Sequence, residues 1–497
     1  MNKKLTAFLF AILCTYSIFA QMPVVVNWVD KVLDTILVEK NIRYGSAFDF
    51  AGDSVPLELN IYRTVCTKGS QILSNQPLLV VIHGGSFLAG NKDEPSIVQY
   101  CKDFAARGYI AVSINYRLGF VNDNGANNCN YPNYQCFFAA DSAEWFRALY
   151  RGIQDANDAI NFMLKYNFPI ILGASGLYQV NAGIDQDNIF VMGESAGALI
   201  ALGVALMDST AEKFPQAYAL NSLPKPHSNT SFCPHNSNRI LPDTIARPDL
   251  GSIFGSQYNA LNRKPIKAVG NMFGALTTDL LKLHKTNQKP AIFSYHRPCD
   301  LVVPIDEGTV YNGLNWCFTN GYGCFAIDNV PKVYGSRSFS KWNDSFNYGY
   351  TISNYFTTDT FNFAYLLGQY SCVNQVNQSC HGYDNRSLRD SLLAAFFAPF
   401  VSSQTRFCLE LVSVDNTDMA SNLLHVYPNP FSETISIRNN TGKNCSYYLY
   451  DMIGRQVMAG IVEIGLQQFQ VSPSLAKGNY VMKVITEQGV LTQRLHH

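Results

Sequence analysis

The sequence predicts an α/β fold, in which a mostly parallel sheet is covered by helices on both faces, followed by a small C-terminal all-β sandwich. Apolar runs that alternate with amphipathic segments predict the first part, because strands buried on both faces lack polar alternation. After residue 424, short strands of alternating polarity are separated by turns, which is typical of a sandwich. With 497 residues the chain is long enough for one large and one small domain.

The elements of the large domain follow one another in a regular order. Residues 36–63 alternate apolar and polar side chains and are expected to form strands, of which VPLELNIY at 55–62 is the clearest. Gly108 is expected to end the first helix. In chain order we expect further strands at 78–82, 110–114, 189–192, 266–272 and 291–295, and helices at 97–107, 142–165 and 198–207.

The N-terminus has the pattern of a secretory signal peptide. Lys3 and Lys4 precede an apolar run, Leu5–Phe19, that ends near Ala20, and cleavage is expected before Gln21. An uncleaved membrane anchor is the alternative, but this run is short for a span. No second apolar run is long enough to cross a membrane, so no stable transmembrane span is expected.

The composition excludes some function classes. Lys plus Arg and Asp plus Glu both total 37, and only 15% of residues are charged, so no basic surface for nucleic acid is expected. Of thirteen cysteines, twelve lie beyond the signal, and this even number favours disulfides in an exported protein. Two close pairs, Cys129 with Cys136 and Cys317 with Cys324, could each close a small ring. The sequence contains no Cys-x-x-Cys pair with matching histidines, so no structural zinc is expected.

Two long segments interrupt the regular pattern, at about 207–262 and 306–362. Long insertions in compact domains tend to be lids or binding loops, so both are expected to select the substrate. The predicted parts of the chain are a signal peptide (1–20), the α/β domain (21–408), a linker (409–423) and the β-sandwich (424–497).

A nucleophile motif follows the predicted strand at 189–192. Residues 193–197 read Gly-Glu-Ser-Ala-Gly, which fits G-x-S-x-G, a sharp strand-to-helix turn that exposes a serine above a sheet. Small residues are needed on either side because the turn crowds the backbone. The motif is therefore expected to place Gly193, Glu194 and Gly197 around a nucleophilic Ser195.

A second motif, His83-Gly84-Gly85-Ser86, directly follows the strand at 78–82. Acyl transfer creates an oxyanion, which preorganised backbone N–H donors stabilise, and glycines allow the close approach that this requires. The residue after the nucleophile, Ala196, is expected to supply a further N–H.

The order of these motifs resembles a known family. HGGSFLAGNK, FAARGYIAVSINYRLG, QDANDAINFM and DNIFVMGESAGA resemble segments of the carboxylesterase and hormone-sensitive-lipase-like α/β-hydrolases, over roughly residues 40–400. The resemblance implies oxyanion donors at the amides of Gly85, Ser86 and Ala196, with Ser86 standing where the family usually has a third glycine. His83 is expected to shape the loop rather than to transfer protons.

The resemblance also selects the acid. PAIFSYHRPCDLVVPIDEG resembles the family segment in which a strand leads to an aspartate followed by Val-Pro, which selects Asp300. Arg297 departs from the glycine that is common after the histidine. Asp306 and Glu307 are the alternative acids.

The base is expected to be a histidine, whose pKa allows it to take and return a proton near neutrality. His381 lies in a loop before a C-terminal amphipathic helix, where the family places its base. The other histidines of the α/β domain downstream of the nucleophile lie too early in the chain, in a helix or next to the acid; they are His227, His235, His284 and His296.

Two cysteines stand next to the proposed acid and base. Cys299 precedes Asp300 and Cys380 precedes His381, and the hydrogen bond between acid and base could bring these cysteines within disulfide range. We therefore expect a Cys299–Cys380 bridge, with Cys372–Cys380 as the alternative.

The end of the chain carries a second resemblance. VYPNPFSETISI, YYLYDMIGRQV and LAKGNYVMKVITEQGVLTQRL resemble the C-terminal sorting domain of the type IX secretion system of Gram-negative bacteria. This implies that residues 424–497 direct export through the periplasm by that machinery, leaving the protein secreted or attached to the cell surface.

Together these expectations describe a secreted serine carboxylic-ester hydrolase. Ser195 would form an acyl-enzyme with His381 as base and Asp300 as acid, with no metal or organic cofactor. Its substrate would be a small or polymer-linked ester. A serine peptidase of the same fold and a catalytically inactive adhesion protein on an esterase scaffold are the alternatives.

Overall fold

The structure is a computed structural model, and its chain divides into two compact units, residues 1–410 and 411–497, which are described separately. The described residues are 24–33, 36–64, 75–121, 139–166, 168, 171–173, 176–178, 183–225, 241–255, 264–281, 289–310, 331–358, 380–381, 385–402, 406–408, 423–451, 455–486 and 489–497. The predicted signal peptide and nearly all of the predicted linker lie outside them. Within the described residues, no helix is long and apolar enough to cross a membrane.

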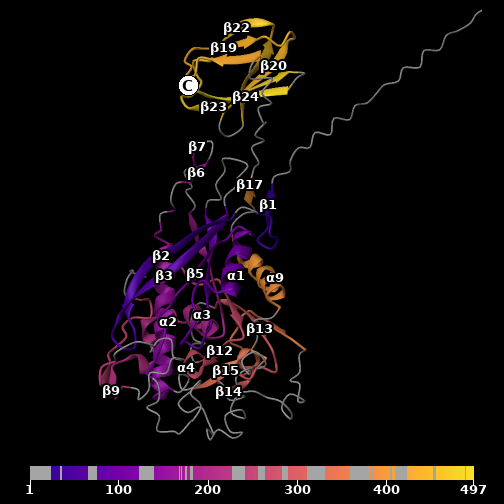
Figure 1. Cartoon of the computed structure of the whole chain (residues 1–497). Coiled ribbons are helices and arrows are strands. Elements are labelled where there is room, and N and C mark those ends of the chain that lie inside the picture. The colour runs from indigo at the N-terminus through magenta and orange to yellow at the C-terminus, as the bar shows by residue number, and fades with distance from the viewer. Residues whose placement is uncertain are drawn as a thin grey trace, which may run out of the picture. The chain divides into compact units, whose positions relative to one another are not determined.

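An eight-stranded sheet forms the centre of the first unit (Figure 1). Its six strands from β16 to β5 run parallel, while β3 is antiparallel to both of its neighbours. The strand order confirms the predicted α/β fold with a mostly parallel sheet. In spatial order the strands are β16 (Ile352–Phe356), β13 (Ala291–His296), β11 (Ala268–Met272), β8 (Ile184–Glu194), β4 (Gln76–Ile82), β5 (Ile110–Ile114), β3 (Ser54–Thr64) and β2 (Ile36–Phe48).

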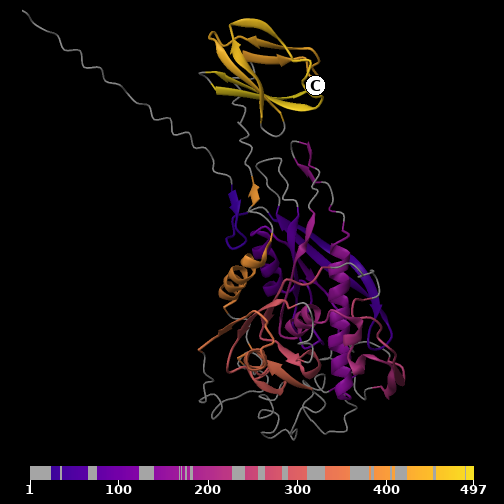
Figure 2. The ribbon, with the colours of Figure 1, turned by 180° about the vertical axis from the view of Figure 1, so that it is seen from behind.

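Helices cover both faces of this sheet (Figures 1 and 2). Residues of α2 (Ser142–Met163) and α3 (Ala196–Leu206) share one buried cluster with Leu78, Val80 and Ile82 of β4. The alternate residues of β4, Leu79 and Val81, belong to a second cluster with α1 (Pro95–Ala105) and α9 (Arg386–Phe397). Every residue of β4 is therefore buried, which explains its unbroken apolar sequence.

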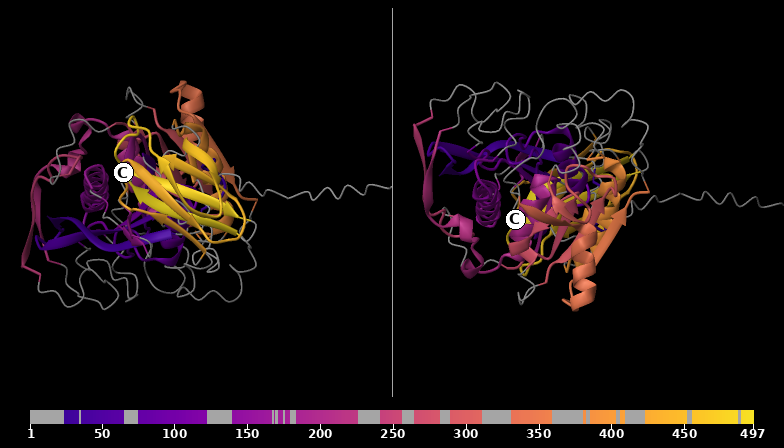
Figure 3. Two further views of the ribbon diagram at one scale, coloured as in Figure 1. Left: turned by 90° about the horizontal axis from the view of Figure 1, so that it is seen from above. Right: turned by 90° about the horizontal axis from the view of Figure 1, so that it is seen from below.

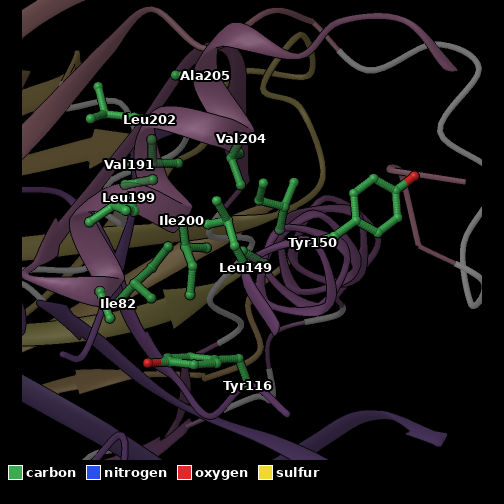
Figure 4. Packing of buried hydrophobic residues seen from close by; sticks show 14 of the residues in the cluster. Ile82, Tyr116, Leu149, Tyr150, Val191, Leu199, Ile200, Leu202, Val204 and Ala205 are labelled. Carbon is green, nitrogen blue, oxygen red and sulfur yellow. The ribbon is translucent and has the colours of Figure 1, made fainter. Parts of the chain in front are cut away.

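Close packing between α2 and α3 fixes the helix that follows the nucleophile motif (Figure 4). A Cβ at Gly152 would lie 2.5 Å from Ile200 Cδ1, and one at Gly203 would lie 2.3 Å from Ile153 Cδ1. An isoleucine of each helix therefore packs against a glycine of the other, and a larger side chain at either glycine would push the two helices apart. This packing holds α3, and with it the turn at Ser195, against the rest of the domain.

The predicted insertion 306–362 is not a lid throughout. It contains β14 (Glu307–Thr309), β15 (Lys332–Gly335), α6 (Ser336–Phe346) and β16, and β16 pairs in parallel with β13 at the edge of the central sheet. The expectation overlooked this strand because its sequence, ISNYF, mixes polar and apolar residues, as is usual at an exposed edge.

The remaining elements of the first unit are short. They are β1 (Val24–Val26), β6 (Ile171–Gly173), β7 (Gly176–Tyr178), η2 (Thr210–Glu212), η3 (Pro215–Ala217), β9 (Leu220–Pro224), β10 (Thr244–Arg247), β12 (Ala275–Thr277), α4 (Thr278–Leu281), η7 (Ala398–Phe400) and β17 (Arg406–Cys408). The predicted Cys129–Cys136 and Cys317–Cys324 pairs lie outside the described residues.

The second unit consists of two antiparallel sheets, drawn in orange to yellow in Figure 3. Apolar residues of both sheets, such as Ile435, Ile437, Leu449 and Val484, form one buried cluster. The predicted C-terminal β-sandwich is therefore confirmed. One sheet contains β18 (Leu424–Tyr427), β19 (Thr434–Asn439) and β22 (Gly465–Gln470), and the other β21 (Gln456–Val462), β20 (Cys445–Asp451), β23 (Asn479–Thr486) and β24 (Gly489–His496).

Candidate active site

Ser195 occupies the sharp turn between β8 and α3. Its φ of 53° and ψ of −122° lie outside the common regions for an L-residue, which is the strained backbone expected of a nucleophile turn. A Cβ at Gly193 would lie 2.1 Å from the Gly197 carbonyl oxygen, and one at Gly197 would lie 2.3 Å from the Ile82 carbonyl oxygen. Both positions therefore require glycine.

The loop after β4 lies against this turn. A Cβ at Gly197 would also come within 2.4 Å of the His83 carbonyl oxygen, so the His83–Ser86 loop begins beside the nucleophile. Gly85 and Ser86 have φ angles of 98° and 59°, a left-handed course that serine adopts less readily than glycine. Ala196 is the first residue of α3, so its N–H has no partner within the helix. The three predicted oxyanion donors thus belong to two adjoining backbone segments.

His83 is buried and held in place by this loop. Its ring stacks on Tyr116 with the centroids 4.4 Å apart, and its Nδ1 lies 2.8 Å from the Gly84 carbonyl oxygen. Burial lowers the pKa of His83 to about 4, so the imidazole is neutral near pH 7. These contacts suit a residue that shapes the loop, as the sequence predicted.

The structure brings the three predicted triad residues together. His381 Nε2 lies 2.8 Å from Ser195 Oγ, and His381 Nδ1 lies 2.8 Å from Asp300 Oδ2. All three side chains are buried. Burial alone would raise the pKa of the Asp300 carboxyl, but the charge of His381 and hydrogen bonds from both His296 and His381 outweigh it, so this pKa lies below its ordinary value. Asp300 is therefore ionised at neutral pH and can orient His381.

The alternative acids are engaged elsewhere. Asp306 forms an ion pair with Arg337, and Glu307 forms one with Lys332. Of the alternative bases, His227, His235 and His284 lie outside the described residues, and His296 contacts Asp300 rather than Ser195. Among the described residues, no group of three His, Cys, Asp or Glu could hold a metal ion.

A disulfide joins the acid loop to the base loop. Cys299 and Cys380 are bonded, with their Cα atoms 5.6 Å apart, which confirms the expected bridge. The alternative pairing of Cys380 with Cys372 is wrong, because Cys380 is already bonded.

Two buried ion pairs anchor α9, the helix that follows His381, and the sequence analysis missed both. Arg389 pairs with Glu194, the residue before the nucleophile, and both side chains are fully buried. Asp390 pairs with Arg107 Nη2 at 2.8 Å. Because the partners lie far apart in the chain, the local sequence does not predict these ion pairs. The one indication in the sequence was the charged Glu194 inside the nucleophile motif.

Two family models match parts of the chain. Residues 65–127 match the BD-FAE family, an esterase- and lipase-like domain, and residues 425–496 match the secretion system C-terminal sorting domain. Neuroligin-like protein glit-1 of Caenorhabditis elegans is 28% identical over 152 residues, which cover 30% of this chain and 16% of that protein. This chain therefore matches only a small part of its curated relative.

Among solved structures, two esterases share 13% identity with this chain. Esterase 2 of Thermogutta terrifontis, phosphorylated by paraoxon, has a TM-score of 0.37 and covers 75% of this chain and 97% of its own. Esterase B of Lactobacillus rhamnosis, inhibited by a tributyrin phosphonate, has a TM-score of 0.35 and covers 75% of this chain and 89% of its own. The matched segments lie in the two parts described above: residues 65–127, which resemble an esterase- and lipase-like domain, lie in the α/β unit with the mostly parallel sheet, and residues 425–496, which resemble a secretion-system C-terminal sorting domain, form the β-sandwich.

Proposed function

We propose that this protein is an exported serine carboxylesterase that works through an acyl-enzyme on Ser195. The observation that carries this proposal is the chain of two 2.8 Å contacts from Ser195 Oγ through His381 to Asp300, at the end of β8. A buried serine, histidine and ionised carboxylate in this order form the arrangement that activates a hydroxyl for attack on a carbonyl.

In the first half of the reaction, His381 Nε2 takes the proton of Ser195 as Oγ attacks the ester carbonyl. The carbonyl oxygen becomes an oxyanion, held by the amides of Gly85, Ser86 and Ala196. Asp300 accepts the Nδ1–H of His381 and stabilises its cationic form. The C–O bond then breaks, and the alcohol leaves with the proton from His381.

In the second half, water replaces the alcohol. His381 takes a proton from the water as its oxygen attacks the acyl carbon, and the same amides hold the second oxyanion. Collapse of this intermediate breaks the bond to Ser195, returns the proton to Oγ and releases the acid. Apart from the substrate and this water, each step uses side chains and amides of the chain.

The match to a sorting domain supports a site of action outside the cell. A match at residues 425–496 supports export through the type IX system of a Gram-negative bacterium, so the enzyme would meet its substrates outside the cell. The substrate would then be an ester on a small molecule or a polymer in the surroundings.

The test is hydrolysis of p-nitrophenyl esters from acetate to decanoate by the mature protein beside Ser195→Ala. We expect activity in the wild type and its loss in the variant. Equal activity in the variant would place the nucleophile elsewhere. A folded wild type that cleaves no ester would favour a peptidase or an inactive adhesion protein on the same scaffold.

A further inference from the structure

A second buried histidine lies beside the acid of the triad. His296 is the last residue of β13 and is fully buried. Its Nε2 lies 3.0 Å from the Val303 carbonyl oxygen and 3.4 Å from Asp300 Oδ2, the oxygen that faces His381. Its Nδ1 lies 2.9 Å from Ser336 Oγ. Its position only four residues before Asp300 had disfavoured it as the base of the triad.

The Val303 carbonyl determines which nitrogen of His296 carries a proton: a carbonyl oxygen can only accept, so Nε2, 3.0 Å from it, is a donor. Asn271 Oδ1 accepts the Gly274 N–H at 2.9 Å, so the amide orientation is fixed and Nδ2 donates to Ser336 Oγ at 3.2 Å. Ser336 Oγ, which accepts from Asn271, can still donate its own proton to His296 Nδ1 at 2.9 Å. The contacts of the ring thus fit an imidazole whose Nε2–H donates to Val303 and whose Nδ1 accepts from Ser336.

We propose that His296 is a positioning residue, which the Val303 carbonyl holds as an Nε2–H donor beside Asp300. The proposal rests on the proposed function. At 3.4 Å the contact with Oδ2 is longer than an ordinary hydrogen bond. The Nε2–H group therefore donates mainly to the Val303 carbonyl oxygen, and its partial positive charge acts electrostatically on Asp300 Oδ2.

The remaining lone pairs of Asp300 are also occupied. Oδ1 accepts the N–H groups of Val302 at 2.8 Å and Val303 at 2.9 Å, while Oδ2 accepts from His381. A carboxylate with a donor on every side stays ionised and cannot rotate. His296 thus moderates how strongly Asp300 attracts His381 and keeps Oδ2 aimed at it.

Other charges near His296 come from the next loop and from α6. Asp306 acts electrostatically with His296, and it forms an ion pair with Arg337 and lies 3.9 Å from Lys341 Nζ. These groups remain unchanged in the variants below, so an altered pH profile can be assigned to the contact between His296 and Asp300.

The test compares three variants of the full chain on p-nitrophenyl acetate. His296→Leu removes the donor, whereas His296→Gln can keep an N–H near the position of Nε2. Ser294→Ala is the matched control, because Ser294 Oγ also accepts from Asn271, at 3.1 Å, whereas Ser294 is not one of the residues that contact the triad above. For each variant, kcat, KM and the pH–rate profile are measured.

We expect His296→Leu to lower kcat about 10- to 100-fold with little change in KM, as for other residues that orient a ligand or base. Without the Nε2–H of His296 beside Oδ2, Asp300 attracts the imidazolium of His381 more strongly, so the acid limb of kcat/KM moves to higher pH. His296→Gln should recover most of both effects, and Ser294→Ala should match the wild type. An unmoved acid limb in His296→Leu, or equal defects in Leu and Gln, would overturn the proposal.

A measurement that needs no turnover separates this proposal from the proposed function. In ¹⁵N-histidine NMR of the wild-type chain at neutral pH, His296 should appear as the neutral Nε2–H tautomer. Observation of the Nδ1–H tautomer would overturn the positioning role whether or not His296→Leu folds. Failure of the proposed function would instead appear as a wild type with the expected tautomer and no ester hydrolysis.

Discussion

The Cys299–Cys380 disulfide offers a perturbation whose size follows from the structure. The bond closes a loop with a sequence separation of 81 residues. The loss of chain entropy in the unfolded state for a loop of this length corresponds to about 4.5 kcal/mol of stabilisation at 25 °C, an upper value because unfolded chains retain some structure. Replacement of both cysteines by serine should lower the free energy of unfolding by up to this amount.

The same replacement should also reduce activity, because the bond joins the residues that precede Asp300 and His381. Looser loops would lower the fraction of molecules with the 2.8 Å contact between His381 and Asp300, so kcat should fall while KM changes little. Urea unfolding followed by tryptophan fluorescence gives the stability, and ester hydrolysis gives kcat.

The matched control is Cys101→Ser, which alters a buried free cysteine in α1 and should leave the acid and base loops unchanged. It should lower kcat less than the double variant does. The reasoning is refuted if the double variant keeps both its stability and its kcat. Non-reduced peptide mapping that finds Cys380 joined to another cysteine would refute it as well.

Three further predictions concern buried groups near the site. Arg389→Met leaves Glu194 buried without its partner and should cost about 3–5 kcal/mol of stability, part of which Glu194→Gln in the same chain should restore; a double-mutant cycle measures this coupling. Gly197→Ala should abolish activity, because its Cβ would lie 2.3 Å from the Ile82 carbonyl oxygen, and ester hydrolysis with circular dichroism checks this against a change of fold. His83 has a pKa of about 4 in the folded protein against an ordinary 6.5, so the unfolded chain binds more protons in this range, and stability should fall as pH drops from 6.5 to 4, by about 3 kcal/mol. Thermal melts of wild type and His83→Gln across this range should differ in slope, and parallel curves would contradict the assignment.

Much of the fold could be predicted because its strands carry strong local patterns. The apolar strands β4, β5 and β13 were expected within two residues of their observed ends, since both of their faces are buried. The edge strand β16 was missed because half of its environment is solvent, which permits polar residues such as Asn354.

The triad of the candidate site could be predicted because each residue type suits its chemical role and stands beside a recognisable motif. Ser195, Asp300 and His381 each follow or precede a recognisable element, and their order along the chain indicated their partnership. The pair Glu194–Arg389 is separated by 195 residues, and the contact of His296 with Ser336 by 40, so neither could be inferred from local sequence. Such contacts depend on how the strands and helices pack.

The most direct test of the account is covalent labelling of Ser195. The mature protein is treated with a fluorophosphonate at neutral pH, and the modified residue is located by peptide mass spectrometry beside His381→Ala and Ser195→Ala. We expect one label on Ser195 in the wild type, much slower labelling in His381→Ala and none in Ser195→Ala. A label on another serine, or a folded wild type that takes no label, would contradict it.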